Sequence, residues 1–321
     1  MKTVTKRIAF LLILIGSLAG KVSAAKVLVP GGELVGLELR DSTVTVAAFD
    51  ETLGKAAQSA GLKAGDRLVQ INDRQIHCVE DVRQALRQSD GLLHISVLRG
   101  EKTHKFKVSP PLTDNGPKLG AYLKQGTTGV GTVTYYDPGT GEFAALGHGV
   151  NTQNGTLLQI ESGTVYDAQV VSVKKGKIGT PGQLVGTLTG TQPTGTVEKN
   201  AAQGVFGTGK DLASGDALPV AQPEEIKAGP AVIRTSVDNT VREYSVEILK
   251  IYPNTKDRCR NMLLKVTDPT LLSTTGGIVQ GMSGSPLVQD GKLIGAVTHV
   301  LVNDPTMGYG IFIENMLEAA G

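Results

Sequence analysis

A serine within a glycine-rich turn is the first residue of this sequence that could act as a nucleophile. Ser283 lies in the segment Gly-Met-Ser-Gly-Ser-Pro, between two apolar runs. Acyl transfer by serine requires a hydroxyl that can attack, a base that accepts its proton, and amides directed at the developing oxyanion. Gly281 permits a backbone conformation that other residues avoid, so the amides of Gly281 and Ser283 can point into one pocket. The turn therefore indicates a serine hydrolase, although a β-turn without chemistry has the same composition.

The base that would accept the serine proton must be one of five histidines. His148 is the stronger candidate because it ends an apolar strand between two glycines, which expose an imidazole and allow other backbone to approach. His299 is its rival. An imidazole with a pKa near ~6.5 can act first as a base and then as an acid close to neutral pH. We therefore expect a pair formed by His148 and Ser283.

An acid that orients the imidazole is harder to identify from the sequence. Asp268 is our choice, in the order His, Asp, Ser, with Asp167 and Asp257 as alternatives. Asp268 also precedes Pro269, and Asp followed by Pro is a common way to begin a helix, so it could equally be an N-cap. Only 15 residues separate it from Ser283, closer than the usual spacing in chymotrypsin-like enzymes.

Composition sets the fold class and excludes several functions. The chain has 321 residues, 41 glycines, 4% aromatic residues and no tryptophan, which is typical of many short strands joined by tight turns and predicts a mostly β protein of two or three domains. A net charge of +2 with mixed signs gives no footprint for nucleic acid. Cys78 and Cys259 form no disulfide framework, and no zinc-binding spacing occurs, so we expect neither metal nor cofactor.

The first 25 residues predict export. Basic residues at the start are followed by an apolar run from Ile8 to Leu18 and a small-residue Val22-Ser23-Ala24 site. The run is shorter than the roughly 20 residues of a comfortable membrane span, so we expect a signal peptide, with an uncleaved anchor as the alternative.

A first domain is predicted over residues 26–109. The phrase Gly-Leu-Lys-Ala-Gly-Asp-Arg-Leu at 61–68, followed by an amphipathic helix with Val79, Val82 and Leu86, resembles a PDZ domain. That resemblance implies a groove that takes an extended peptide by strand addition. We place the groove at Val35, Gly36 and Leu37, where a plain glycine-rich turn is the alternative. Prolines and glycines at 110–117 predict a linker.

The second domain is predicted over residues 118–321, with many short strands and a closing helix at 313–320. Its last third resembles the chymotrypsin-like proteases, which are double β-barrels. By that resemblance Val297, Thr298 and His299 form the edge strand that pairs with substrate. Met282 replaces the acidic residue that trypsin-like relatives carry before the serine, which argues against activation by a freed N-terminus.

Taken together, the segments Ala-Leu-Gly-His-Gly-Val, Val-Thr-Asp-Pro-Thr-Leu-Leu and Gln-Gly-Met-Ser-Gly-Ser-Pro resemble the stage IV sporulation protein B peptidases of endospore-forming bacteria. The resemblance covers nearly the whole chain and implies His148, Asp268 and Ser283 as the catalytic residues. It implies export into the space between the two forespore membranes, self-cleavage near the N-terminus, and cleavage of the membrane-bound regulatory subunit of a protease complex that processes pro-sigma-K. A PDZ-containing envelope stress protease and a catalytically inactive PDZ scaffold are the alternatives.

Overall fold

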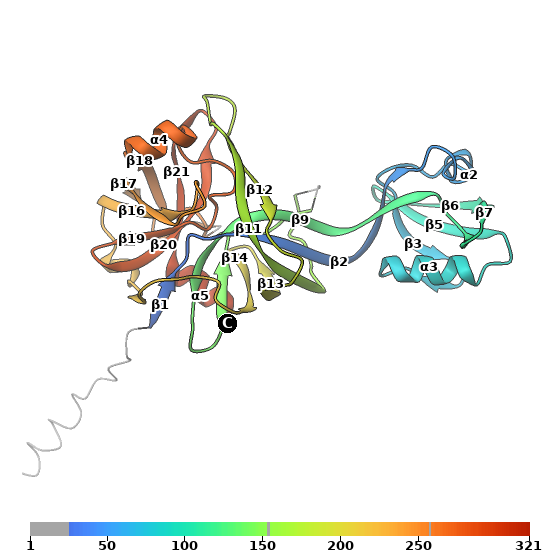
Figure 1. Cartoon of the computed structure of the whole chain (residues 1–321), viewed down its shortest axis with the longest axis horizontal. Coiled ribbons are helices and arrows are strands. Elements are labelled where there is room, and N and C mark those ends of the chain that lie inside the picture. Colours follow the sequence, from blue (N-terminus) through green and yellow to red (C-terminus); the bar gives the residue numbers. More distant parts are fainter. Residues whose placement is uncertain (1–25, 153–154, 257) are drawn as a thin grey trace, which may run out of the picture.

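The computed structural model describes residues 26–152, 155–256 and 258–321. The predicted export segment, residues 1–25, and the alternative acid Asp257 lie outside the described residues. In the described part of the chain, no helix has both the length and the apolar character needed to cross a membrane. Two β-barrels lie together, and a smaller domain stands apart from them at the end of a two-stranded ribbon (Figure 1).

The first barrel is a ring of antiparallel strands. Each strand pairs with the next, and the ring closes where β2 pairs with β9. Around the ring lie β2 (Leu34–Phe49), β9 (Ala121–Tyr136), β10 (Glu142–Ala145), β14 (Gly204–Gly209), β13 (Gly195–Ala201) and β11 (Ser162–Lys174). Alternate side chains such as Leu37, Leu39, Val133 and Val165 fill its interior, as the two-residue period of a strand requires.

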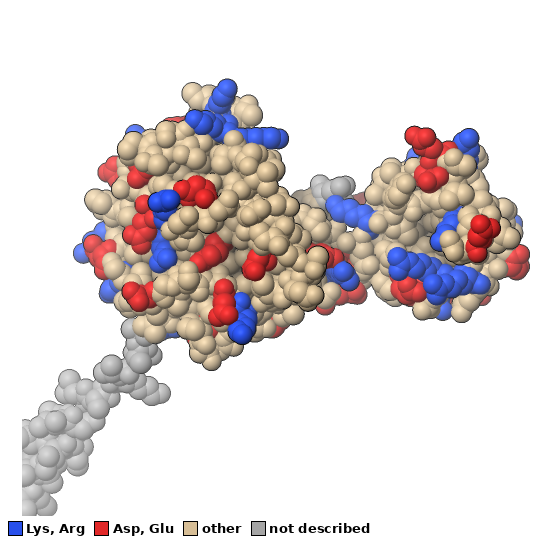
Figure 2. All heavy atoms as spheres, in the orientation of Figure 1, with Lys and Arg blue, Asp and Glu red and all other residues tan. Residues whose placement is uncertain are grey.

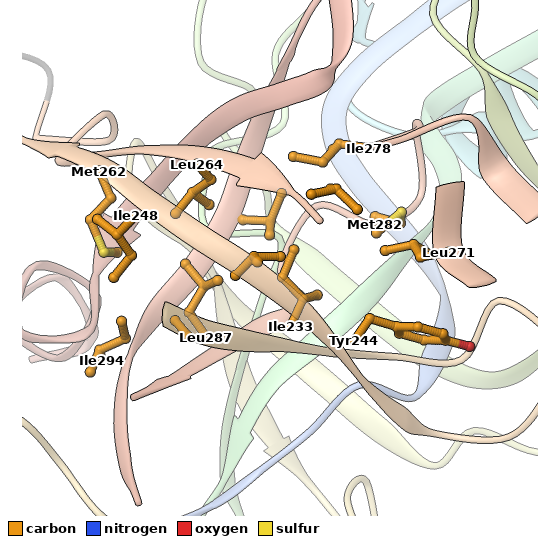
Figure 3. Close-up of a cluster of buried hydrophobic side chains, with 14 of the residues drawn as sticks. Ile233, Tyr244, Ile248, Met262, Leu264, Leu271, Ile278, Met282, Leu287 and Ile294 are labelled. Carbon is orange, nitrogen blue, oxygen red and sulfur yellow. The ribbon is translucent and has the colours of Figure 1, made fainter. Parts of the chain in front are cut away.

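The second barrel is closed and is formed entirely by the C-terminal part of the chain. Its order is β16 (Gly229–Thr235), β17 (Arg242–Ile251), β18 (Met262–Val266), β21 (Asp304–Phe312), β20 (Lys292–Leu301) and β19 (Pro286–Gln289). Figure 3 shows Ile233, Ile248, Leu264 and Leu287 meeting in its core, where all four are almost fully buried. Burial of each such side chain stabilises the fold by about 1.5–3 kcal/mol. The mostly β, double-barrel architecture expected from the sequence is confirmed.

Shorter elements join and cover the barrels. Helix α5 (Ile313–Ala320) closes the chain at the residues predicted for it. The others are β1 (Val27–Pro30), β12 (Gln183–Leu188), β15 (Leu218–Pro219), η1 (Pro223–Glu225) and α4 (Pro269–Thr275). Strand β12 pairs with the outer half of β11, so these two strands form a hairpin that projects beyond the first barrel (Figure 1).

The PDZ domain is an insertion within the first barrel and does not precede it. Its core joins the outer half of β2, from Val44 onward, to α3 and the neighbouring strands, and ends with Leu119 and Leu123 of the returning chain. Its own elements are α2 (Lys55–Ser59), β3 (Arg67–Ile71), β4 (Arg74–Gln75), α3 (Val79–Arg87), β5 (Leu93–Arg99), β6 (Lys102–Val108), β7 (Leu112–Thr113) and β8 (Gly116–Pro117).

The domain boundaries expected at 26–109 and 118–321 are corrected accordingly. Residues 27–39 pair within the first barrel, and the expected linker at 110–117 contains the β7–β8 hairpin beside the PDZ core. The physical reason is that β2 and β9 each run 16 residues without a break, crossing from one domain to the other. The glycines near the crossing, Gly126, Gly129 and Gly131, lie inside β9, so they do not mark a domain boundary.

Candidate active site

The turn that carries Ser283 is held by the first barrel. The Thr132 hydroxyl on β9 donates to the Gly281 carbonyl at 2.7 Å, and the Thr134 hydroxyl donates to the Gly284 carbonyl at 2.8 Å. The Thr132 amide also donates to the Ser283 carbonyl at 3.1 Å. Both threonines are buried and lie two residues apart, on the same face of the strand. The serine is therefore positioned where the two barrels meet.

The glycine after the serine is required by close packing. Gly284 has a φ of +94°, and a Cβ there would lie 2.1 Å from the Thr132 carbonyl oxygen and 2.4 Å from the Leu146 amide nitrogen. Backbone of the first barrel therefore occupies the space that a side chain at this position would need. On the other side, Met282 is buried in the second barrel core with Leu271 and Ile278 (Figure 3).

Two amides of this turn remain available to an oxyanion. Gln280, Met282 and Gly284 donate their amides to the carbonyls of Gly182, Val279 and Val297, respectively. Within the described residues, the amides of Gly281 and Ser283 donate to no protein acceptor. Gly281 has a φ of +100°, the left-handed conformation that the sequence predicted. The turn thus presents two adjacent backbone donors, which is what a developing oxyanion requires.

Ser283 and His148 line one cavity of about 610 Å³. The first barrel contributes His148, which follows β10, together with the inner parts of β2 and β9, and the second barrel contributes Ser283 and β20. The His148 and His299 rings lie 5.4 Å apart between centroids. Among the described residues that line the cavity, these two histidines are the only ionisable side chains.

The hydrogen bond of His148 defines which of its nitrogens can act as a base. Nδ1 lies 3.0 Å from the Gly149 carbonyl oxygen. A carbonyl only accepts, so Nδ1 carries the proton in the neutral ring and Nε2 is left as an acceptor. Burial lowers the pKa of His148 below 6.5, and the bond to Gly149 opposes this shift. The ring is therefore neutral, and able to accept a proton, near pH 7.

The Ser283 hydroxyl donates to the Thr298 carbonyl at 3.1 Å. It must leave this acceptor before it can donate to His148. The Thr298 carbonyl belongs to the strand that we predicted to pair with substrate, so the Ser283 hydroxyl occupies an acceptor on that strand.

The predicted substrate strand is only partly open. Thr298 and His299 line the cavity, but Val297 donates its amide to the Ser285 carbonyl and accepts at its own carbonyl from the Gly284 amide. Val297 is thus corrected to a residue that fixes the serine turn. The edge that an added peptide could use begins at Thr298.

Asp268 is not brought to His148 by this structure. It caps helix α4, where Oδ1 accepts from the Thr270 and Leu271 amides at 2.8 and 2.9 Å. Asp268 is not among the residues that line the cavity, and the alternative Asp167 is exposed on β11. In this structure Asp268 is therefore an N-cap, the alternative given above. The contact that orients the His148 ring comes from the Gly149 carbonyl.

The peptide groove predicted at Val35, Gly36 and Leu37 is also corrected. These residues lie in the first barrel, where β2 is paired on one side with β9 and on the other with β11. No edge is left there for an added strand. A cavity of about 480 Å³ lies in the PDZ domain instead, between α3 and the start of β9.

The loop before β9 shapes this PDZ cavity, which Val82, Leu86, Leu119 and Leu123 line. Gly120 has a φ of +66°, and a Cβ there would lie 2.2 Å from the Leu53 carbonyl carbon. The segment Lys-Leu-Gly-Ala-Tyr-Leu at 118–123, a glycine turn followed by a strand, is the sequence signal for this loop. It was missed because the prolines and glycines before it suggested a linker.

Two closed barrels that share a serine, a histidine and a pair of backbone amides define a serine endopeptidase of the chymotrypsin-like type, here with a PDZ insertion. A family model for the SpoIVB peptidase S55 matches residues 115–317, more than half of the chain, so the chain belongs to the SpoIVB peptidase S55 family. A PDZ domain model matches residues 54–99.

Solved structures of other proteases are similar over part of the chain. The Rv3671c protease from M. tuberculosis in its active form has 16% sequence identity and a TM-score of 0.36, over 60% of this chain and 72% of that one. The HtrA-type protease AlgW with decapeptide has 16% identity and a TM-score of 0.36, over 66% of this chain and 58% of that one. Among curated proteins, none matches this sequence.

Proposed function

We propose that this serine endopeptidase uses Ser283 as nucleophile and His148 as base, and that it acts in sporulation signalling. The observation that supports the catalytic proposal is the cavity that Ser283 and His148 both line. Beside the Ser283 hydroxyl, the amides of Gly281 and Ser283 donate to no acceptor among the described residues. The signalling part is supported by the family to which the chain belongs.

The reaction begins when an extended peptide approaches the open edge at Thr298. A substrate amide that donates to the Thr298 carbonyl displaces the Ser283 hydroxyl, which can then donate to Nε2 of His148. As Oγ attacks the peptide carbonyl carbon, Nε2 takes its proton and the carbonyl oxygen becomes an oxyanion held by the two amides. The imidazolium gives the proton to the leaving amine, and water then hydrolyses the acyl-enzyme with His148 again as base.

The proposed substrates are the chain's own N-terminal region and the membrane-bound regulatory subunit of a protease complex, whose cleavage triggers pro-sigma-K processing. The proposed place of action is the space between the two forespore membranes, reached by export. The PDZ cavity between α3 and β9 is proposed to hold the end of an extended peptide, because it combines apolar side chains with the start of β9, which among the described strands pairs there with β2 alone.

Comparison of the purified full chain with its Ser283→Ala variant tests the proposal. Intact mass spectrometry should find N-terminal trimming in the wild type and none in the variant, and a fluorophosphonate should label the wild type at Ser283. Absence of both trimming and label in the wild type, in every buffer, would favour an inactive PDZ scaffold. Trimming that persists in Ser283→Ala would refute the nucleophile.

A further inference from the structure

The tip of the β11–β12 hairpin exposes an apolar side chain without a covering partner in the described structure. Ile178 is 81% exposed, and Val302, from the neighbouring β20–β21 turn, is 47% exposed. The Gly179 amide donates to the Val302 carbonyl at 2.9 Å, so the two apolar residues belong to one surface.

Three lysines surround this tip. Lys174, Lys175 and Lys177 are exposed, and the segment 174–182 contains no acidic residue. Among the described residues, none forms an ion pair with these lysines. Figure 2 shows basic side chains gathered where the hairpin projects from the peptidase. The tip is therefore a cluster of three lysines around an exposed isoleucine, with no described carboxylate in an ion pair with them.

The tip is held in place by backbone hydrogen bonds. Lys177 and Thr180 exchange amide-to-carbonyl bonds of 2.9 and 2.8 Å, and the Gly176 amide donates to the Thr275 carbonyl at the end of α4. The exposure of Ile178 is thus built into a fixed turn.

The tip also adjoins the active-site cavity. Pro181, which follows the tip, and Val302 both line the cavity that contains Ser283 and His148. A surface that the tip touched would lie beside the cavity mouth.

We propose that Lys174, Lys175 and Lys177, with Ile178 and Val302, form a docking surface for an anionic lipid membrane. Clustered lysines attract anionic headgroups, and exposed aliphatic side chains enter the interface beneath them. A membrane fits this surface better than a protein partner, because lysine is depleted at protein interfaces and a projecting tip offers little area. Docking needs no peptidase activity. Its consequence, presentation of the cavity to membrane-bound substrates, rests on the proposed function.

A probe on the full chain tests the docking. Ile178→Cys in a Cys78→Ser background, with buried Cys259 retained, is labelled with nitrobenzoxadiazole and mixed with vesicles of phosphatidylcholine with or without phosphatidylglycerol. Leu112→Cys on the PDZ domain is the matched control because Leu112 is also 81% exposed. Both labelled chains carry the same N-terminus, so attachment through it is common to them.

We expect a blue shift and a severalfold rise in emission at position 178 with the anionic vesicles, and neither change at 112. The triple variant K174E/K175E/K177E should lose the response. K102E/K105E/K107E, which reverses three exposed lysines of β6, should keep it. An equal response at 178 and 112, no dependence on phosphatidylglycerol, or equal loss in both triple variants overturns the proposal. A response that appears only when a protein partner is added also overturns it.

Measurements of peptidase activity distinguish the docking proposal from the proposed catalytic function. K174E/K175E/K177E should hydrolyse a soluble peptide at the wild-type rate and a vesicle-tethered copy of the same peptide severalfold more slowly. Ser283→Ala should hydrolyse neither but should keep the probe response. If Ser283→Ala remains active while the probe responds, the catalytic proposal fails and the docking surface stands.

Discussion

At the scale of single residues, the site depends on groups that hold the reacting atoms in place. Ser283 and His148 could be selected from the sequence because glycines mark both positions. Thr132 could not be, because its role arises from contact with a turn about 150 residues further along the chain. Asp268 shows the converse. The sequence around it indicated an N-cap, whereas a role in orienting His148 was implied only by the family resemblance.

Thr132→Val tests the support of the serine turn. The variant keeps the side-chain shape but removes the bond to the Gly281 carbonyl, which should cost about 1–3 kcal/mol and tilt the oxyanion amides. We expect kcat toward a peptide to fall roughly tenfold or more while KM changes little. Thr196→Val, at an exposed position on β13, is the control. An unchanged kcat in Thr132→Val would mean that the turn holds itself.

Asp268 should matter for stability more than for turnover. Asn caps helices nearly as well as Asp, whereas Ala does not, so Asp268→Asn should keep the melting temperature and Asp268→Ala should lose about 1 kcal/mol. Both should keep kcat within a few fold. An orienting acid would behave differently, because its amide replacement costs on the order of 10⁴ in kcat. Such a loss in Asp268→Asn would place the carboxylate in the catalytic group after all.

Burial of the His148 imidazole allows a prediction of how kcat/KM falls at low pH. Burial lowers the pKa of His148, so the folded enzyme keeps a neutral base to a lower pH than free histidine would. The acid limb of kcat/KM should therefore lie below about 6.5. The same shift means that unfolding takes up a proton below that value, so stability should fall as pH drops from about 6.5. A limb well above 6.5 would contradict this assignment.

At the scale of elements, glycines determine where strands can approach loops. The short strands and tight turns of both barrels were predicted from glycine, proline and β-branched residues. The sequence did not indicate which segment lines the PDZ cavity, because an extended chain beside a glycine turn occurs both at Val35–Leu37 and at 118–123. Only the pairing of both β2 edges in the barrel distinguishes the two.

Gly120→Ala should weaken the PDZ domain alone. The new Cβ would overlap Leu53 backbone at 2.2 Å, in addition to the cost of a positive φ. Gly116→Ala is the matched control, since its φ is +89° but a Cβ there meets nothing within 4 Å. Hydrogen exchange should show loss of protection around α3 in Gly120→Ala, less in Gly116→Ala, and none in the second barrel. Equal loss of protection in the two variants would mean that the positive φ, and not the overlap with Leu53, causes the destabilisation.

At the scale of the whole molecule, the peptidase is a complete double barrel into which another domain has been inserted. The ends of the insertion lie side by side, because Leu39 pairs with Thr127 on β2 and β9. Sequence order alone could not show this, since an inserted domain and a preceding domain give the same succession of motifs.

Replacement of residues 41–125 by an Asn-Gly turn should therefore leave both barrels folded. Asn-Gly closes a tight hairpin, and β2 and β9 would remain paired up to that turn. We expect cooperative thermal unfolding and fluorophosphonate labelling of Ser283 in the shortened protein. A chain that fails to fold, while Gly120→Ala folds normally in its barrels, would show that the PDZ domain contributes to barrel stability.

Because β9 runs from one cavity to the other, its length gives the distance between them. Leu123 lines the PDZ cavity and Thr127–Val130 line the peptidase cavity on the same strand. At about 3.3 Å per residue, the nearest lining positions on the strand, Leu123 and Thr127, lie roughly 13 Å apart. A single polypeptide that engaged both cavities at once would have to place its anchored end and its scissile bond at least about four extended residues apart, so shorter tails could be anchored or cut, but not both together.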